Sequence, residues 1–131
     1  MHPITFRDDL HKKRFAALLN RANKRMRHVP SIQSILYLTT GNIELLKIFN
    51  DYFFPETGEF FFKEMLEDER SDRSLFVQTQ LVVQLYNGRT TLTIAELIDH
   101  LTRPEMELAL NAIAIRALGV DQAELRNTIN A

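Results

Sequence analysis

Asp8 and His11 are the two side chains in this 131-residue sequence whose types and spacing come closest to catalytic chemistry. Residues three apart on a helix lie on the same side, so this carboxylate and this imidazole could together hold a metal ion or accept a proton. Asp8 also precedes a helical pattern, as a capping residue does, and His11 falls on the apolar face of that pattern. We therefore expect a capping aspartate and a partly buried structural histidine. A small metal-dependent hydrolase or nuclease is the alternative.

Other features typical of enzymes are missing from the sequence. Glu64, Glu67 and Asp68 could form a carboxylate cluster, but a solvated acidic helix face is the simpler interpretation. There is no cysteine, the four histidines follow no metal-ligand spacing, and the four glycines form no phosphate-binding loop. The sequence therefore predicts a protein that is not an enzyme and that needs neither a cofactor nor a metal ion.

Charge is divided unevenly between the start of the chain and the rest. The first 30 residues hold eight Lys and Arg residues and two Asp residues, whereas the remaining 101 residues hold eight basic and fifteen acidic ones. The acidic residues concentrate between Asp51 and Asp72, where there are eight of them and two basic residues. Such a division predicts either a charged partner molecule or contact between the two parts of the chain.

The early basic residues lie on a predicted amphipathic helix over residues 8–27. Phe15, Leu18 and Leu19 recur at the spacing of one helical face, and cations occupy the other side. We expect the cationic side to bind an acidic protein surface through Lys13, Arg14, Arg21, Lys24 and Arg25. Nucleic acid is a second possible partner, and pairing with the acidic stretch, within the chain or across a homodimer, is a third. A merely solvated face is the remaining alternative. A membrane is not expected, because the opposite face is only modestly apolar.

Hydrophobic patterns and stop signals predict further helices in the first two thirds of the chain. Residues 31–40 are expected to form a helix that Gly41 ends, and Asn42 to cap a helix over residues 43–54 that stops before Pro55. The run from Leu75 to Tyr86 is predicted to be a buried helix, with a strand as the alternative because valine and threonine are frequent in it.

Three pairs of residues mark helix starts in the last third: Thr93 with Glu96, Thr102 with Glu105, and Asp121 with Glu124. The second pair opens a segment that is apolar almost all round, so Leu108–Leu118 is expected to be the central helix, with Leu110 and Ile113 buried and Asn111 buried and hydrogen-bonded. The sequence thus predicts an all-α fold. It is expected to be one globular domain over residues 1–131, a compact bundle of about six or seven helices.

Residues 93–118 also have the organisation of a helix-turn-helix motif, which makes a DNA-binding regulator a further alternative. However, Glu105 and Glu107 occupy positions where a recognition helix needs hydrogen-bond donors for base edges. Ordinary core packing is therefore the expected role of this pair of helices.

Four stretches resemble a family of small bacterial proteins described only as a domain of unknown function: FRDDLHKKRF, ILYLTTGN, LTIAELIDHL and NAIAIRALG. The resemblance extends from about Phe6 to Gly119 and is weak between Phe60 and Asp72. Members of that family are frequent on prophages and other mobile elements. The resemblance implies a phage or mobile-element accessory protein that acts by binding a macromolecule, and inhibition of a host-defence nuclease of the CRISPR type is one concrete form of that function. It carries over no catalytic residues.

Targeting signals are absent from the sequence as well. The start of the chain lacks the apolar stretch of a signal peptide, and no run approaches the length of a membrane span. Together with the lack of cysteine, this predicts a cytoplasmic protein.

Overall fold

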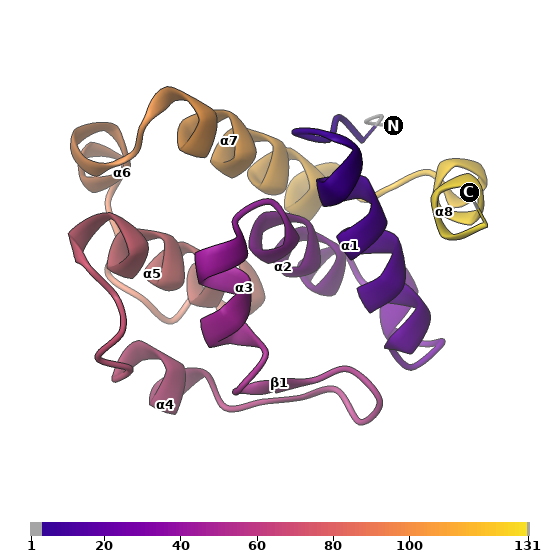
Figure 1. The fold of residues 1–131 in the computed structure, drawn as a ribbon, viewed down its shortest axis with the longest axis horizontal. Coiled ribbons are helices and arrows are strands. Elements are labelled where there is room, and N and C mark those ends of the chain that lie inside the picture. The colour runs from indigo at the N-terminus through magenta and orange to yellow at the C-terminus, as the bar shows by residue number, and fades with distance from the viewer. Residues whose placement is uncertain (1–3, 131) are drawn as a thin grey trace.

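The computed structural model describes residues 4–130, and α-helices account for most of them (Figure 1). The elements are α1 (Asp9–Arg21), the 3-10 turn η1 (Met26–His28), α2 (Pro30–Thr40), α3 (Ile43–Phe49), β1 (Phe53–Phe54), β2 (Glu59–Phe60), α4 (Phe62–Leu66), α5 (Arg73–Asn87), α6 (Ile94–His100), α7 (Arg103–Leu118) and α8 (Gln122–Ile129). This architecture confirms the predicted all-α class. Within residues 4–130, no helix is long and apolar enough to cross a lipid bilayer.

α2 is the most enclosed helix and lies in the middle of the others, with α1, α3, α5 and α7 packed around it (Figure 1). Every residue from Ile32 to Thr40 is buried. A helix buried on all sides must satisfy its polar side chains internally, and the hydroxyls of Thr39 and Thr40 donate hydrogen bonds to the carbonyls of Ile35 (2.8 Å) and Leu36 (2.6 Å). The prediction of a helix over residues 31–40 is confirmed.

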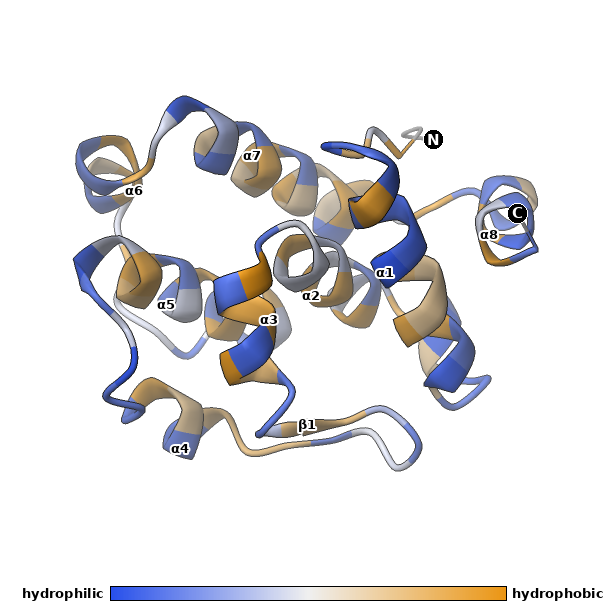
Figure 2. Cartoon of the chain, in the orientation of Figure 1, coloured by the Kyte–Doolittle hydropathy of each residue, from blue (hydrophilic) through white to orange (hydrophobic). Residues whose placement is uncertain are grey.

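α7 lies along one side of α2, at the surface, so the prediction that it is the central helix is wrong. Its inner side is buried through Leu108, Ala109, Ala112 and Ile115, whereas Leu110 is 58% exposed and Ile113 40% exposed. Figure 2 shows hydrophilic residues at the start of α7 and apolar residues along much of the rest. Because α7 is apolar on almost all sides, it was expected at the centre of the core. α2 is more continuously apolar and lies there instead.

Asn111 is half-buried, less than predicted, and it is hydrogen-bonded as predicted. Its side-chain amide donates to the hydroxyl of Tyr37 at 3.1 Å. That hydroxyl in turn donates to the carbonyl of Thr5 at 2.6 Å. The chain of bonds links α7, α2 and the segment before α1.

The helix expected over residues 43–54 ends early, at Phe49, and a hairpin follows it. Asn42 caps α3 as predicted, but Phe53 pairs with Phe60 and Phe54 with Glu59 in an antiparallel ladder. The ring of Phe53 stacks on that of Phe49, with centroids 4.8 Å apart, and the ring of Phe60 meets both edge-on. The extended backbone buries these aromatic rings together, which outweighs continuation of the helix towards Pro55.

The remaining predicted boundaries agree closely with the structure. The segment from Leu75 to Tyr86 is helical, within α5, and ends at Gly88, whose φ of 71° is the left-handed conformation that glycine favours. Thr93 and Thr102 both form complete capping boxes with the glutamates three residues later. Asp121 caps α8, but Glu124 accepts a hydrogen bond from the backbone N–H of Ile4 at 2.8 Å, so the third box does not close.

A matched pair of substitutions on α7 tests its two-sided environment. Leu108→Ala removes a buried side chain that is 3% exposed and should lower the free energy of unfolding by about 2–5 kcal/mol. Leu110→Ala removes a side chain that is largely in water and should cost less than about 1 kcal/mol. Urea unfolding of both variants measures the difference. Equal losses would contradict the placement of α7 at the surface.

Candidate functional site

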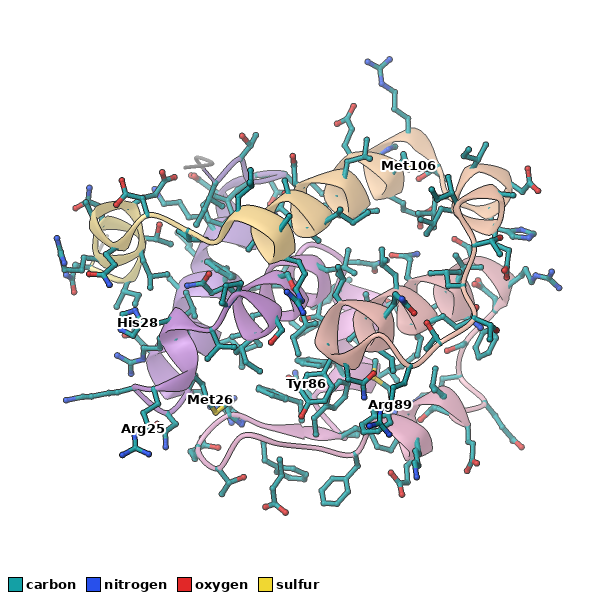
Figure 3. All side chains as sticks on the ribbon, turned by 180° about the vertical axis from the view of Figure 1, so that it is seen from behind. Arg25, Met26, His28, Tyr86, Arg89 and Met106 are labelled. Carbon is teal, nitrogen blue, oxygen red and sulfur yellow. The ribbon has the colours of Figure 1, made fainter. Side chains whose placement is uncertain are left out.

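The five basic residues expected to bind a partner do not share one helical face. α1 ends at Arg21, because Ala22 turns to an extended conformation and the next backbone N–H, that of Asn23, donates to the carbonyl of Pro55 at 3.0 Å. Lys24 and Arg25 therefore lie beyond the helix, in the turn before η1. Figure 3 shows Arg25 pointing away from the body of the protein, beside Met26. The prediction of one cationic helix face over residues 8–27 is wrong in this respect.

Arg14 and Arg21 are the two predicted residues that the structure brings together at one site. They lie seven residues apart on α1, about 10.5 Å along the axis on nearly the same side, and both line a groove between α1 and α3. The cavity has a volume of about 180 Å³ and is lined by Arg14, Ala17, Leu18, Arg21, Thr40, Leu46 and Asn50. Lys13 lies about 100° around the helix from Arg14 and does not line it.

The groove has an apolar lining between Arg14 and Arg21. Ala17, Leu18 and Leu46 supply the apolar lining, and Asn50, just past the end of α3, supplies an exposed amide. Nothing in the sequence spacing indicated that α3 would lie against this side of α1. The contribution of Leu46 and Asn50 was therefore missed, although the broad apolar face of α3 signalled that this helix packs on a neighbour.

Only one of the five predicted cations pairs with the acidic stretch. The Nε of Arg21 lies 3.3 Å from a carboxylate oxygen of Glu56, with both side chains about 60% exposed (59% and 61%). No carboxylate within residues 4–130 forms an ion pair with Lys13, Arg14, Lys24 or Arg25. The cationic surface is thus largely left open to a partner.

The acidic stretch satisfies part of its charge locally. The guanidinium of Arg70 binds Asp51 at 2.7 Å and Asp68 at 2.8 Å, and the hydroxyl of Tyr52 donates to Asp68 at 2.6 Å. The hydrogen bonds from Arg70 hold the pKa of Asp68 well below its usual range, and the bond to Asp68 raises the pKa of Tyr52. Glu64 and Glu67 are exposed, as expected of a solvated acidic face.

His11 has a structural role in the fold, as expected, and is fully buried. Its Nδ1 accepts a hydrogen bond from the backbone N–H of Arg7 at 3.0 Å, so the proton is on Nε2, which donates to the carbonyl of Tyr37 at 2.8 Å. Asp8 caps α1 by accepting from the N–H of His11 at 2.8 Å. Both ring nitrogens are therefore occupied. Within residues 4–130, no group of three or more histidine, aspartate or glutamate side chains is arranged to hold a metal ion.

α7 is the second helix of the pair that resembles a helix-turn-helix motif. The acidic side chains at its start bond to other residues of the protein. Glu105 closes the capping box and also accepts hydrogen bonds from Ser74 (3.2 Å) and Gln78 (3.1 Å) of α5. Glu107 pairs with Arg103 at 3.2 Å. These carboxylates would repel a phosphate backbone, so this geometry does not favour a recognition helix.

Comparisons with known proteins do not connect the chain to a family. No protein-family model matches the sequence, and no curated protein or solved structure gives a significant match. The resemblance to small prophage proteins consequently stays a prediction.

The environment of His11 predicts a specific pH dependence of stability. Burial lowers the pKa of His11 from its ordinary value of 6.5, opposed by the hydrogen bond to Tyr37 and by Asp8, while Arg14 and Arg7 lower it further. Below pH 6.5 the unfolded chain takes up this proton before the folded protein does. Folding stability should therefore be complete above pH 6.5 and fall below it, by up to about 1.4 kcal/mol per pH unit.

His11→Gln tests this prediction, since its side-chain amide can still donate to the carbonyl of Tyr37 but does not titrate. Thermal unfolding between pH 5 and pH 7.5 should show a flatter profile for His11→Gln than for the unsubstituted protein. His28 is exposed, so His28→Gln is the matched control and should leave the profile unchanged. If both substitutions flatten the profile equally, the buried histidine is not the cause.

Proposed function

We propose that the protein is a non-enzymatic binding protein that holds an acidic segment of another protein in the groove between α1 and α3. The observation that carries this proposal is the pair of arginines, Arg14 and Arg21, on either side of an apolar interior. Carboxylates of the partner would pair with the guanidinium groups, and an apolar side chain between them would enter the groove. Lys24 and Arg25, near the end of α1, would add to the attraction at longer range.

A partner helix can match the distance between the two arginines. Carboxylates seven residues apart on a helix lie about 10.5 Å apart along its axis and on nearly the same side. The exposed pair between Arg21 and Glu56 is of a kind that contributes about 0–1 kcal/mol, so a carboxylate of the partner can replace Glu56 at little cost. Arg14 has no ion-pair partner within residues 4–130 to displace.

The biological setting that we propose is that of an accessory protein of a phage or mobile element, and it rests on the sequence resemblance alone. Inhibition of a host-defence nuclease would require an acidic segment on that nuclease for the groove to hold. Proteins of this kind act inside the bacterial cell, which agrees with the cytoplasmic location expected from the sequence.

Charge reversal of the groove tests the proposed function. The probe is a 15-residue helical peptide with glutamates seven residues apart and a leucine midway, measured by isothermal titration calorimetry. Arg14→Glu with Arg21→Glu should abolish binding and leave the melting temperature nearly unchanged, because the one ion pair these side chains form is exposed. Raising the salt concentration should weaken binding by the unsubstituted protein.

Lys13→Glu is the matched control, since it makes the same charge change on α1 outside the groove and should weaken binding only slightly. A peptide with glutamine in place of both glutamates should not bind. If double-stranded DNA binds more tightly than the acidic peptide, the partner class is wrong. If the double reversal changes the oligomeric state in sedimentation instead, the basic residues serve a homodimer.

A further inference from the structure

The hairpin presents an aromatic pair to solvent on its outer side. Strand alternation turns Phe53 and Phe60 inward, where they are 2% and 8% exposed, and Phe54 and Phe61 outward, where they are 43% and 44% exposed. Nearly half of each outer residue's surface is therefore left in contact with water.

The two outer rings hold each other in an edge-to-face arrangement, with centroids 5.7 Å apart and planes at 83°. This geometry is favourable for an aromatic pair and leaves π-electron surface open to a ligand. A cation placed over such a face is attracted by the ring quadrupole, and a guanidinium does this best because it can stack flat and is weakly hydrated.

The carboxylate of Glu59 borders the aromatic pair. Glu59 lies opposite Phe54 in the hairpin register, and so on the same side, where its carboxylate accepts from the hydroxyl of Thr57 at 3.2 Å. Asp68 is not available to a ligand in the same way, because its side chain is 9% exposed and it already binds Arg70 and Tyr52. Glu59 has no basic partner within residues 4–130.

The charge of the residues around Phe54 and Phe61 indicates which class of ligand can bind there. Between Glu59 and Glu69 the chain has five acidic residues and one basic residue, Lys63. A nucleic acid or an anionic membrane would be repelled, and an uncharged apolar segment would leave the carboxylates without partners. A cationic segment gains from the rings and from the carboxylates together.

We propose that this outer face of the hairpin, made by Phe54, Glu59 and Phe61, binds an arginine-containing segment of a partner protein. One guanidinium stacks on the aromatic pair and a second pairs with the carboxylate of Glu59. The site is independent of the groove between α1 and α3, because it uses different residues and selects the opposite charge.

Binding of a defined peptide tests this inference. The probe is a fluorescein-labelled 12-residue glycine–serine peptide with three alternate arginines, measured by fluorescence anisotropy against the full chain. Phe54→Leu with Phe61→Leu keeps apolar area and removes the π faces, and it should weaken binding about tenfold. Glu59→Gln should weaken binding several-fold and make it less sensitive to salt. Circular dichroism melting confirms that each variant is folded.

A control variant and a control peptide separate stacking on the hairpin from general attraction between a cationic peptide and the protein surface. Ile98→Ala removes an exposed apolar side chain of α6 and should leave the affinity unchanged. A peptide with neutral citrulline in place of arginine should not bind. If the leucine variant keeps full affinity, or if the citrulline peptide binds equally well, the inference is overturned. Loss of acidic-peptide binding alone concerns the groove and leaves this inference intact.

Discussion

The burial of α2 on every side is the constraint on which the rest of the structure depends. A fully buried helix needs apolar neighbours around its whole circumference, and α1, α3, α5 and α7 supply them. The threonine hydroxyls of α2 are satisfied within the helix and the Tyr37 hydroxyl through Thr5 and Asn111, whereas the side-chain oxygen of Gln33 has no hydrogen-bond partner within residues 4–130. The groove between α1 and α3 is a consequence, because both helices pack on α2 and Thr40 of α2 lies in the lining between them.

Packing on α2 also determines which side chains face outward. Phe15, Leu18 and Leu19 of α1 are buried, so the phase of the helix turns Arg14 and Arg21 towards the groove. In the hairpin, burial of Phe53 and Phe60 turns the alternate phenylalanines outward. The two surfaces of opposite charge are therefore products of the core, and they adjoin where Arg21 meets Glu56.

Local signals in the sequence predicted the local structure. Asp8, Asn42, Thr93 and Thr102 all cap the helices they were expected to cap, because a capping bond depends on residues at most three apart. The errors concern interactions between distant residues: α3 ends early because Phe53 meets Phe60, and α1 ends early because Asn23 bonds to Pro55. For the same reason the sequence places Arg14 and Arg21 on α1 but does not indicate that Leu46 and Asn50 lie beside them in the groove.

His11 illustrates why residue type alone does not identify a catalytic group. Its spacing from Asp8 suggested chemistry, but burial favours the neutral imidazole and both ring nitrogens bond to backbone groups, which links the segment before α1 to α2. The charged groups of Arg14 and Glu59 differ from the ring of His11 in their partners. Neither forms an ion pair within residues 4–130, so folding does not depend on these charges and they stay available to a partner. In this protein, chemistry suited to binding lies where the core does not require it, on α1 and on the outer side of the hairpin.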